Sequence, residues 1–237
     1  MNVRGITALA VTLSAALLPA CGSTPSKDGG DPNPESAHMS RHSDEASELE
    51  AALVDGDLER ARLPAAWLSG HEGMNGLGPE TDVFVSLMRE AAGGIFASTS
   101  LESAAVEMGR MGTACGACHL ATGTELTYEW EDYAPSSMEM QPHMARHAWA
   151  VDRLWEGLSG PSDEAWKMGA RVLEGDPLDR EHTTAEAGRR YRAEAWDQLV
   201  HSLAAEAEDA GPAEKGEFYS QVISACNACH ALVRVRS

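Results

Sequence analysis

The chain has 237 residues, 43% of them hydrophobic, which is enough for one large domain or two domains of about 100 residues each. Acidic residues number 37 and basic residues 18, so the formal net charge is −19. This charge argues against nucleic acid as a partner, because binding to phosphates requires an excess of Lys and Arg. Five cysteines are an odd number, and their positions decide how the chain is interpreted.

Residues 1–20 have the pattern of a secretory signal peptide. Arg4 precedes an apolar run over 6–18 that is too short to cross the ~30 Å hydrocarbon core of a bilayer. The run ends in Leu-Pro-Ala before Cys21, which resembles the bacterial lipobox. The resemblance implies that Cys21 becomes the lipidated first residue of the mature chain. The alternative is an ordinary signal peptide, with Cys21 a free thiol. In either case we expect the protein to be exported.

Residues 21–37 are expected to form a flexible tether, because the stretch after Cys21 consists mainly of Gly, Ser, Pro, Asp and Asn. A segment of this length reaches roughly 20–25 Å root-mean-square. With a lipidated Cys21, it would hold the folded part facing the periplasm, close to a bacterial membrane.

The remainder reads as eight helices without strands, which predicts an all-α protein. Gly, Asp and Pro mark most of the breaks between amphipathic stretches. In the first half Leu49, Leu53, Val83, Leu87 and Met88 are expected to face inward. The predicted helices span 39–55, 57–69, 80–92 and 100–118 in the first half, and 140–158, 162–174, 183–209 and 212–233 in the second. We expect a first unit at 38–123, a linker at 124–138 whose aromatic residues pack between the halves, and a second unit at 139–237.

The fourth predicted helix of each half carries the sequence C-x-x-C-H, at 115–119 and at 226–230. This is the attachment signature of haem c. Two thiols add to the two vinyl groups of the porphyrin, and the adjacent His binds the iron. The predicted cofactors are two covalently attached haem groups. The residues predicted to hold them are Cys115, Cys118, Cys226 and Cys229 as attachment points, and His119 and His230 as iron ligands.

Three other uses of these four cysteines fit the sequence less well. Disulfides suit an oxidising compartment but do not explain the His after each pair. Zinc knuckles usually lie 12–20 residues apart, far closer than these two motifs. A thioredoxin-like redox pair needs a strand–helix setting, and no strand is predicted. Haem attachment is therefore the preferred interpretation.

The two halves are an internal repeat. Residues 38–42 (HMSRH) recur at 143–147 (HMARH), at similar distances before the two C-x-x-C-H motifs. Leucines also recur at the same spacing after each copy, as Leu49 and Leu53 and as Leu154 and Leu158.

A haem motif at the end of a fourth helix resembles the cytochrome c′ and cytochrome c-556 family. This resemblance implies two tandem four-helix bundles over 38–123 and 139–237. It also implies that the first helix of each bundle supplies the residue on the distal side of the iron. A Met there suits electron transfer, whereas an apolar residue leaves the iron open to small gases.

Two residues in each first helix could be the distal ligand. His42 and His147 are favoured, because imidazole binds ferric haem more strongly than thioether. Met39 and Met144 are the alternatives, an open site is a third, and His38 and His143 are weaker candidates. Repeated arginines, Arg41 and Arg146, are either partners of haem propionates or exposed charges. The remaining histidines, His71, His182 and His201, are expected at the surface or in loops.

These features together predict an exported di-haem cytochrome c that carries electrons and is not an enzyme. Its acidic surface would favour a redox partner with a basic docking face. The main alternative is a gas-binding or gas-sensing protein with an open distal site. A di-haem peroxidase is disfavoured by the symmetry of the repeat, and a structural zinc protein is the remotest alternative.

Overall fold

A computed structural model describes residues 34–70, 78–128, 130, 140–175 and 187–233. Within these ranges the chain forms α-helices and no strands, so the expected all-α class is confirmed. The helices are α1 (Pro34–Val54), α2 (Leu58–Gly70), α3 (Asp82–Ala97), α4 (Leu101–Thr122), α5 (Met140–Ser159), α6 (Asp163–Glu174), α7 (Ala187–Ala207) and α8 (Pro212–Val233).

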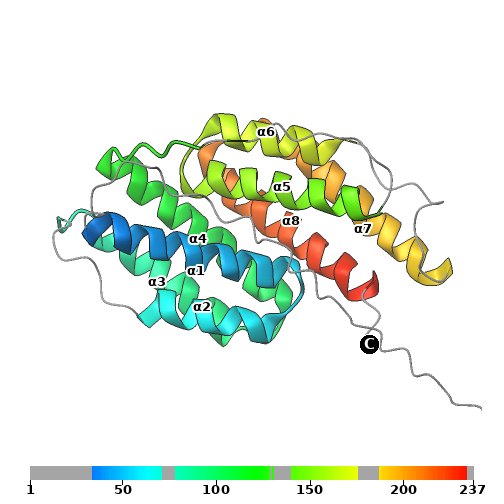
Figure 1. Cartoon of the computed structure of the whole chain (residues 1–237), viewed down its shortest axis with the longest axis horizontal. Helices are drawn as coiled ribbons and strands as arrows, with labels where there is room; N and C mark the ends of the chain where they lie inside the picture. The colour runs from blue at the N-terminus through cyan, green and yellow to red at the C-terminus, as the bar shows by residue number, and fades with distance from the viewer. Residues whose placement is uncertain (1–33, 71–77, 129, 131–139, 176–186, 234–237) are drawn as a thin grey trace, which may run out of the picture.

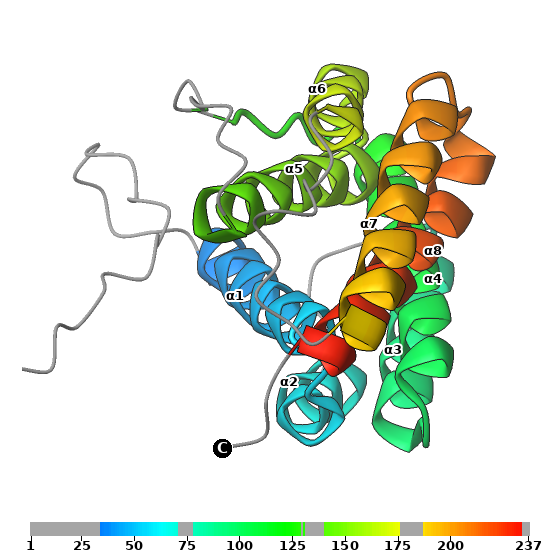
Figure 2. The same cartoon turned by 90° about the vertical axis from the view of Figure 1, so that its right-hand side faces the viewer.

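Helices that follow one another in the sequence pack against one another, from α1 to α4 and again from α5 to α8 (Figure 1). The two sets meet where α4 packs along α8, and α4 also contacts α5. In the view of Figure 2, α2 and α6 lie at opposite ends of the molecule. The first and fourth helices of each set touch only slightly, and this is where the cavities described below are found.

Local sequence signals explain where several helices begin and end. The hydroxyl of Ser100 accepts a hydrogen bond from the Ser103 backbone N–H at the start of α4, and Ser162 does the same for Ala165 at the start of α6. Gly123 ends α4 in the left-handed region, at φ 65°, which a residue without a side chain adopts at little cost.

The repeated leucines lie in the core, as expected. Leu49, Leu53 and Leu154 are fully buried and Leu158 is nearly so. Because the two leucines of each pair lie four residues apart, they share the apolar face that α1 or α5 turns inward.

Two expectations for α3 were wrong. Val83 and Leu87 are 55% and 49% exposed, and the inner face is formed by Met88, Ala91, Ala92 and Ile95. The helix also continues through Gly93 and Gly94 to Ala97. Glycine costs about 1 kcal/mol in a helix, but burial of Ile95 in the core compensates for it.

The close contact between α4 and α8 depends on glycine. A Cβ at Gly109 would collide with the backbone carbonyl of Gly216 and the hydroxyl of Ser220. Gly216 in turn has no room for a side chain beside Thr113. These positions let the two motif-bearing helices approach at backbone distance.

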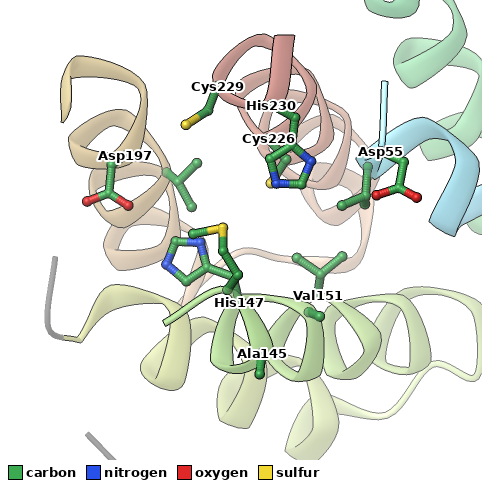
Figure 3. A pocket seen from close by; sticks show the side chains of 12 residues that line it. Asp55, Ala145, His147, Val151, Asp197, Cys226, Cys229 and His230 are labelled. Atoms are coloured by element: carbon green, nitrogen blue, oxygen red, sulfur yellow. The ribbon is translucent and has the colours of Figure 1, made fainter. Parts of the chain in front are cut away.

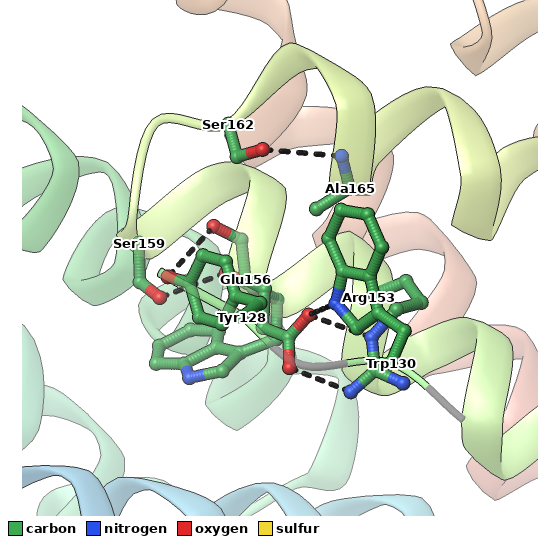
Figure 4. A network of polar contacts seen from close by, with 8 residues as sticks. Tyr128, Trp130, Arg153, Glu156, Ser159, Ser162 and Ala165 are labelled. Atoms are coloured by element: carbon green, nitrogen blue, oxygen red, sulfur yellow. Dashed lines mark hydrogen bonds and ion pairs between the residues drawn. The ribbon is translucent and has the colours of Figure 1, made fainter. Parts of the chain in front are cut away.

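The aromatic residues of the linker pack against α5 (Figure 4). The indole of Trp130 donates a hydrogen bond of 2.8 Å to the carboxylate of Glu156, and the hydroxyl of Tyr128 donates to the Glu156 carbonyl at 3.4 Å. Arg153 binds the same carboxylate, with its nearest N–O distance at 2.6 Å. The linker thereby fastens the chain that leaves α4 to the second half.

The predicted signal peptide, Cys21 and most of the tether lie outside the described residues, and so does Tyr133. The last tether residues, 34–37, are helical, so the predicted boundary between tether and folded unit at 37 was wrong. Among the helices that are described, none combines the length and the apolar character needed to cross a bilayer.

Candidate functional site

The two C-x-x-C-H motifs occupy the C-terminal parts of α4 and α8, which are helices of equal length. Their four cysteines are not joined by disulfides. Each motif lines a cavity of its own, so the two pairs of thiols do not form a shared four-cysteine zinc site.

The first cavity, of about 670 Å³, contains the motif of α4. Cys115, Cys118 and His119 line one side, and the α1 residues His38, Met39 and His42 line another. Residues of α2, α3, α4, α5 and the segment that follows α4 line the rest of the cavity. The structure thus brings together the predicted attachment residues and all the distal candidates of the first half.

The second cavity, of about 310 Å³, contains the motif of α8. Figure 3 shows His147 of α5 on one side of the cavity and His230 of α8 on the opposite side. Cys226, Cys229 and Met144 also line this space, and Val54 and Asp55 reach it from the end of α1. Both cavity volumes fall within the ~300–1,000 Å³ range of small-molecule and cofactor sites.

His119 is held in one orientation and one tautomer by a backbone group. Its Nδ1 lies 2.7 Å from the carbonyl oxygen of Ser159, at the end of α5. A carbonyl only accepts, so Nδ1 carries the proton and Nε2 keeps its lone pair for a metal. Gly116, inside the motif, has no room for a Cβ beside the Leu158 carbonyl, and this close approach brings His119 to Ser159.

The thiols are protonated at neutral pH. Burial raises the pKa of Cys115 and of Cys226 to about 12, and that of Cys229 to about 11. Burial also raises the pKa of Cys118. Redox-active and zinc-binding cysteines need the thiolate, which electropositive surroundings favour. The environment of these four thiols is the opposite, which disfavours a redox-active cysteine pair.

His147 is a neutral imidazole. Burial, followed by the neighbouring His143 and His201, holds its pKa well below the usual range. It is 8% exposed, and its Nε2 is buried without a hydrogen-bond partner among the described residues. A neutral ring with an unused nitrogen beside a cavity is suited to bind a metal ion.

The corresponding histidines of the first half are more exposed and are arranged differently. The Nε2 atoms of His38 and His42 lie 3.0 Å apart, so one ring donates to the other. The ring of His42 also packs edge-on against Trp67 at a centroid distance of 5.4 Å. Met39 is 36% exposed at the edge of this group.

The repeated arginines do not line either cavity. Arg41 is exposed, lies 3.7 Å from Glu45 and stacks over Trp67. Arg146 is 7% exposed and donates to the Gly175 carbonyl. The repeat therefore does not give these two residues equivalent surroundings.

One prediction about the other histidines was wrong. His201 lies on α7 and is only 7% exposed, although it was expected at the surface. It packs beside His143 and His147, close to Asp197. Its spacing of four residues from Asp197 was the available signal, since this spacing places both on one helix face. His71 and His182 lie outside the described residues.

A second polar group was also missed. The hydroxyl of Tyr219, on α8, donates a hydrogen bond to the carboxyl of Glu50, on α1, and both are buried. Glu50 also lines the first cavity. No periodicity or motif connects residues so far apart in the sequence.

Comparisons with known proteins give no further identification. No family model, no curated protein and no solved structure matches the chain.

Proposed function

We propose that the protein is an exported di-haem c-type cytochrome that carries electrons, built as two tandem four-helix units at 38–123 and 139–237. One observation carries the proposal: each C-x-x-C-H motif faces a cavity whose other walls include the repeated His and Met of the first helix. The sequence repeat is thus matched by a repeat in the two sites.

The residues present fit haem c. Cys115 and Cys118 would form the thioethers in the first cavity, and Cys226 and Cys229 those in the second. His119 offers Nε2 to the iron because its Nδ1 is bound to the Ser159 carbonyl. When bound, each haem supplies one-electron chemistry between ferric and ferrous iron.

The protein's own residues position the iron ligands and limit the access of water. Met111 and Ala114, nearly fully buried, lie on the wall of the first cavity next to the motif. Val151 and Val200 do the same in the second cavity. Apolar walls lower the local dielectric, and burial is one of the means by which a protein sets the reduction potential of its haem.

His42 and His147 are the proposed distal ligands, with Met39 and Met144 as alternatives. His147 is supported by its neutral ring and its unused Nε2. His42 is supported by its place on the wall of the first cavity and by the repeat. Six-coordinate iron favours electron transfer, whereas an open site would favour the binding of gases.

The proposal also covers the redox partner and the membrane anchor of the protein. With a net charge of −19, the protein is suited to a redox partner with a basic docking face, and the association would weaken with added salt. We further propose that Cys21 is lipidated and anchors the chain to a membrane through the tether.

Visible and electron paramagnetic resonance spectra of the ferric protein test the electron-transfer role. We expect two low-spin haems in the wild type. His42→Ala and His147→Ala should each convert one of the two haems to a high-spin form that binds CO after reduction. Met39→Ala and Met144→Ala are the matched controls and should leave the spin state unchanged.

High-spin haem in Met39→Ala and Met144→Ala, with no change in the two histidine variants, would make methionine the distal ligand. High-spin, CO-binding haem in the wild type would replace the electron carrier with a gas-binding protein. A protein without a Soret band would disprove the haem proposal itself.

A further inference from the structure

Four buried polar side chains gather between α5 and α7, next to the second cavity. His143 and His147 stand four residues apart on α5, and Asp197 and His201 stand four apart on α7, so each pair lies on one face of its helix. The four side chains offer ligand atoms that all lie within 4.8 Å of one another. Each is less than a tenth exposed.

Asp197 lies between two imidazoles. Its Oδ1 is 3.0 Å from His143 Nε2, and its Oδ2 is 3.5 Å from His201 Nε2. Oxygen and nitrogen ligands at 2.0–2.2 Å from a tetrahedral zinc ion are separated by about 3.3 Å. The two distances lie on either side of this value, each to a different oxygen of the carboxylate. The shorter one is a hydrogen bond, whose proton a bound ion would replace.

The tautomer of His201 points to a cation. Its Nδ1 lies 3.0 Å from the carbonyl oxygen of Glu174, to which it must donate. The other ring nitrogen, Nε2, faces a carboxylate oxygen of Asp197 and is buried without a hydrogen-bond partner among the described residues. A metal ion between this nitrogen and the carboxylate would satisfy both atoms. A metal-binding His is commonly fixed by a backbone carbonyl in this way.

We propose that His143, Asp197 and His201 bind one divalent transition-metal ion of the zinc or iron(II) class. Two imidazoles and one carboxylate are a ligand set that these ions use, with a further position open. Mg²⁺ and Ca²⁺ prefer oxygen ligands and would bind poorly. His147 remains for the haem of the second cavity, and Asp197, which also lines that cavity, places the ion beside it. The metal site itself does not depend on haem.

The first half does not repeat this arrangement. His38 and His42 have the same spacing as His143 and His147, but they contact each other and Trp67. In the described part of the chain, no second group of metal-ligating side chains accompanies them. One ion per chain is therefore expected, and the first half provides an internal control.

Zinc binding to the full-length, haem-loaded protein tests the site. After treatment with a chelator, equilibrium dialysis against Zn²⁺ with elemental analysis should give one tightly bound zinc per chain. Asp197→Asn and His201→Ala should each weaken binding at least ~10-fold. His38→Ala, the matched change in the first half, should retain one zinc, and Mg²⁺ should not compete.

The variant His147→Ala separates this proposal from the haem proposal. It should keep its zinc while one haem becomes high-spin. Loss of zinc from a His147→Ala protein with wild-type circular dichroism would make His147 a ligand and overturn the three-residue site. Equal zinc binding by the wild type and by Asp197→Asn would also overturn it. Haem content, measured separately, reports on the function proposed above.

Discussion

Glu50 is a carboxyl group buried in the contact between the two halves. It is 6% exposed and accepts a hydrogen bond from Tyr219. Burial, and then the negative charge of Asp152, raise its pKa well above the usual value. The folded protein therefore keeps a proton on Glu50 at a pH where the unfolded chain has released it.

The free energy of unfolding should depend on this proton. Glu50 contributes its full stability below about pH 4.3, the pKa of an unfolded Glu, and loses it as pH rises toward the folded pKa. The slope is about 1.4 kcal/mol per pH unit for one proton. Glu50→Gln keeps a hydrogen-bonding side chain but cannot ionise, so it should remove this slope.

Urea unfolding, followed by circular dichroism between about pH 5 and pH 7, measures the effect. The difference between wild type and Glu50→Gln isolates this group from the other carboxyls. Parallel pH profiles for the two proteins would show that Glu50 is ionised in the folded state, contrary to the account.

The sequence predicts candidate site residues where a proposed chemistry requires a short spacing. Cys115, Cys118 and His119 stand out because haem attachment needs these residue types next to one another, and the structure places all three on the wall of one cavity. Ser159 does not stand out, because its contribution is a backbone carbonyl that any residue could supply. Glu50 does not, because its partner Tyr219 is 169 residues away.

At the scale of helices, the contact between α4 and α8 sets the positions of both motifs. Glycine at 109 permits the close approach, because any side chain there meets the backbone of α8. Gly93, in the last turns of α3, has no such role, because a Cβ there would make only an ordinary contact of 3.9 Å with Ser69.

Alanine at these two positions should have opposite effects. Gly109→Ala should lower the free energy of unfolding by about 1–3 kcal/mol, because the added methyl group overpacks the contact. Gly93→Ala should raise it by up to about 1 kcal/mol, because alanine favours the helix. Urea denaturation of both variants provides the comparison. A stabilising Gly109→Ala would mean that the helices do not approach this closely.

The sequence predicts that the helices exist and roughly where they lie. It predicts less well which face of a helix points inward and where the helix ends. Helices α2, α5, α6 and α8 match their expected ranges to within one residue, because periodic apolar residues and breaking residues agree. Helix α1 begins at Pro34, five residues before its expected start at 39. In α3 the sequence offered several apolar residues, and packing against α2 and α4 selected Ala91, Ala92 and Ile95 over Val83 and Leu87.

On the scale of the whole molecule, each half contributes to the site of the other. His119 of α4 binds the carbonyl of Ser159 at the end of α5. In the second cavity, Val54 and Asp55 at the end of α1 form part of the wall beside His230 (Figure 3). A single sequence repeat predicts the two units but not this exchange, because it arises only when α4 and α8 pack together.

The central claim is that two haems are covalently attached to this chain. The intact mass of the denatured protein tests it most directly, after expression in a host that attaches haem to exported C-x-x-C-H proteins. We expect the mass of the mature chain plus two haem groups. After Cys115 and Cys118 are both changed to Ser, we expect the mass of the chain plus one haem group. A wild-type mass without haem, or with one haem only, would contradict it.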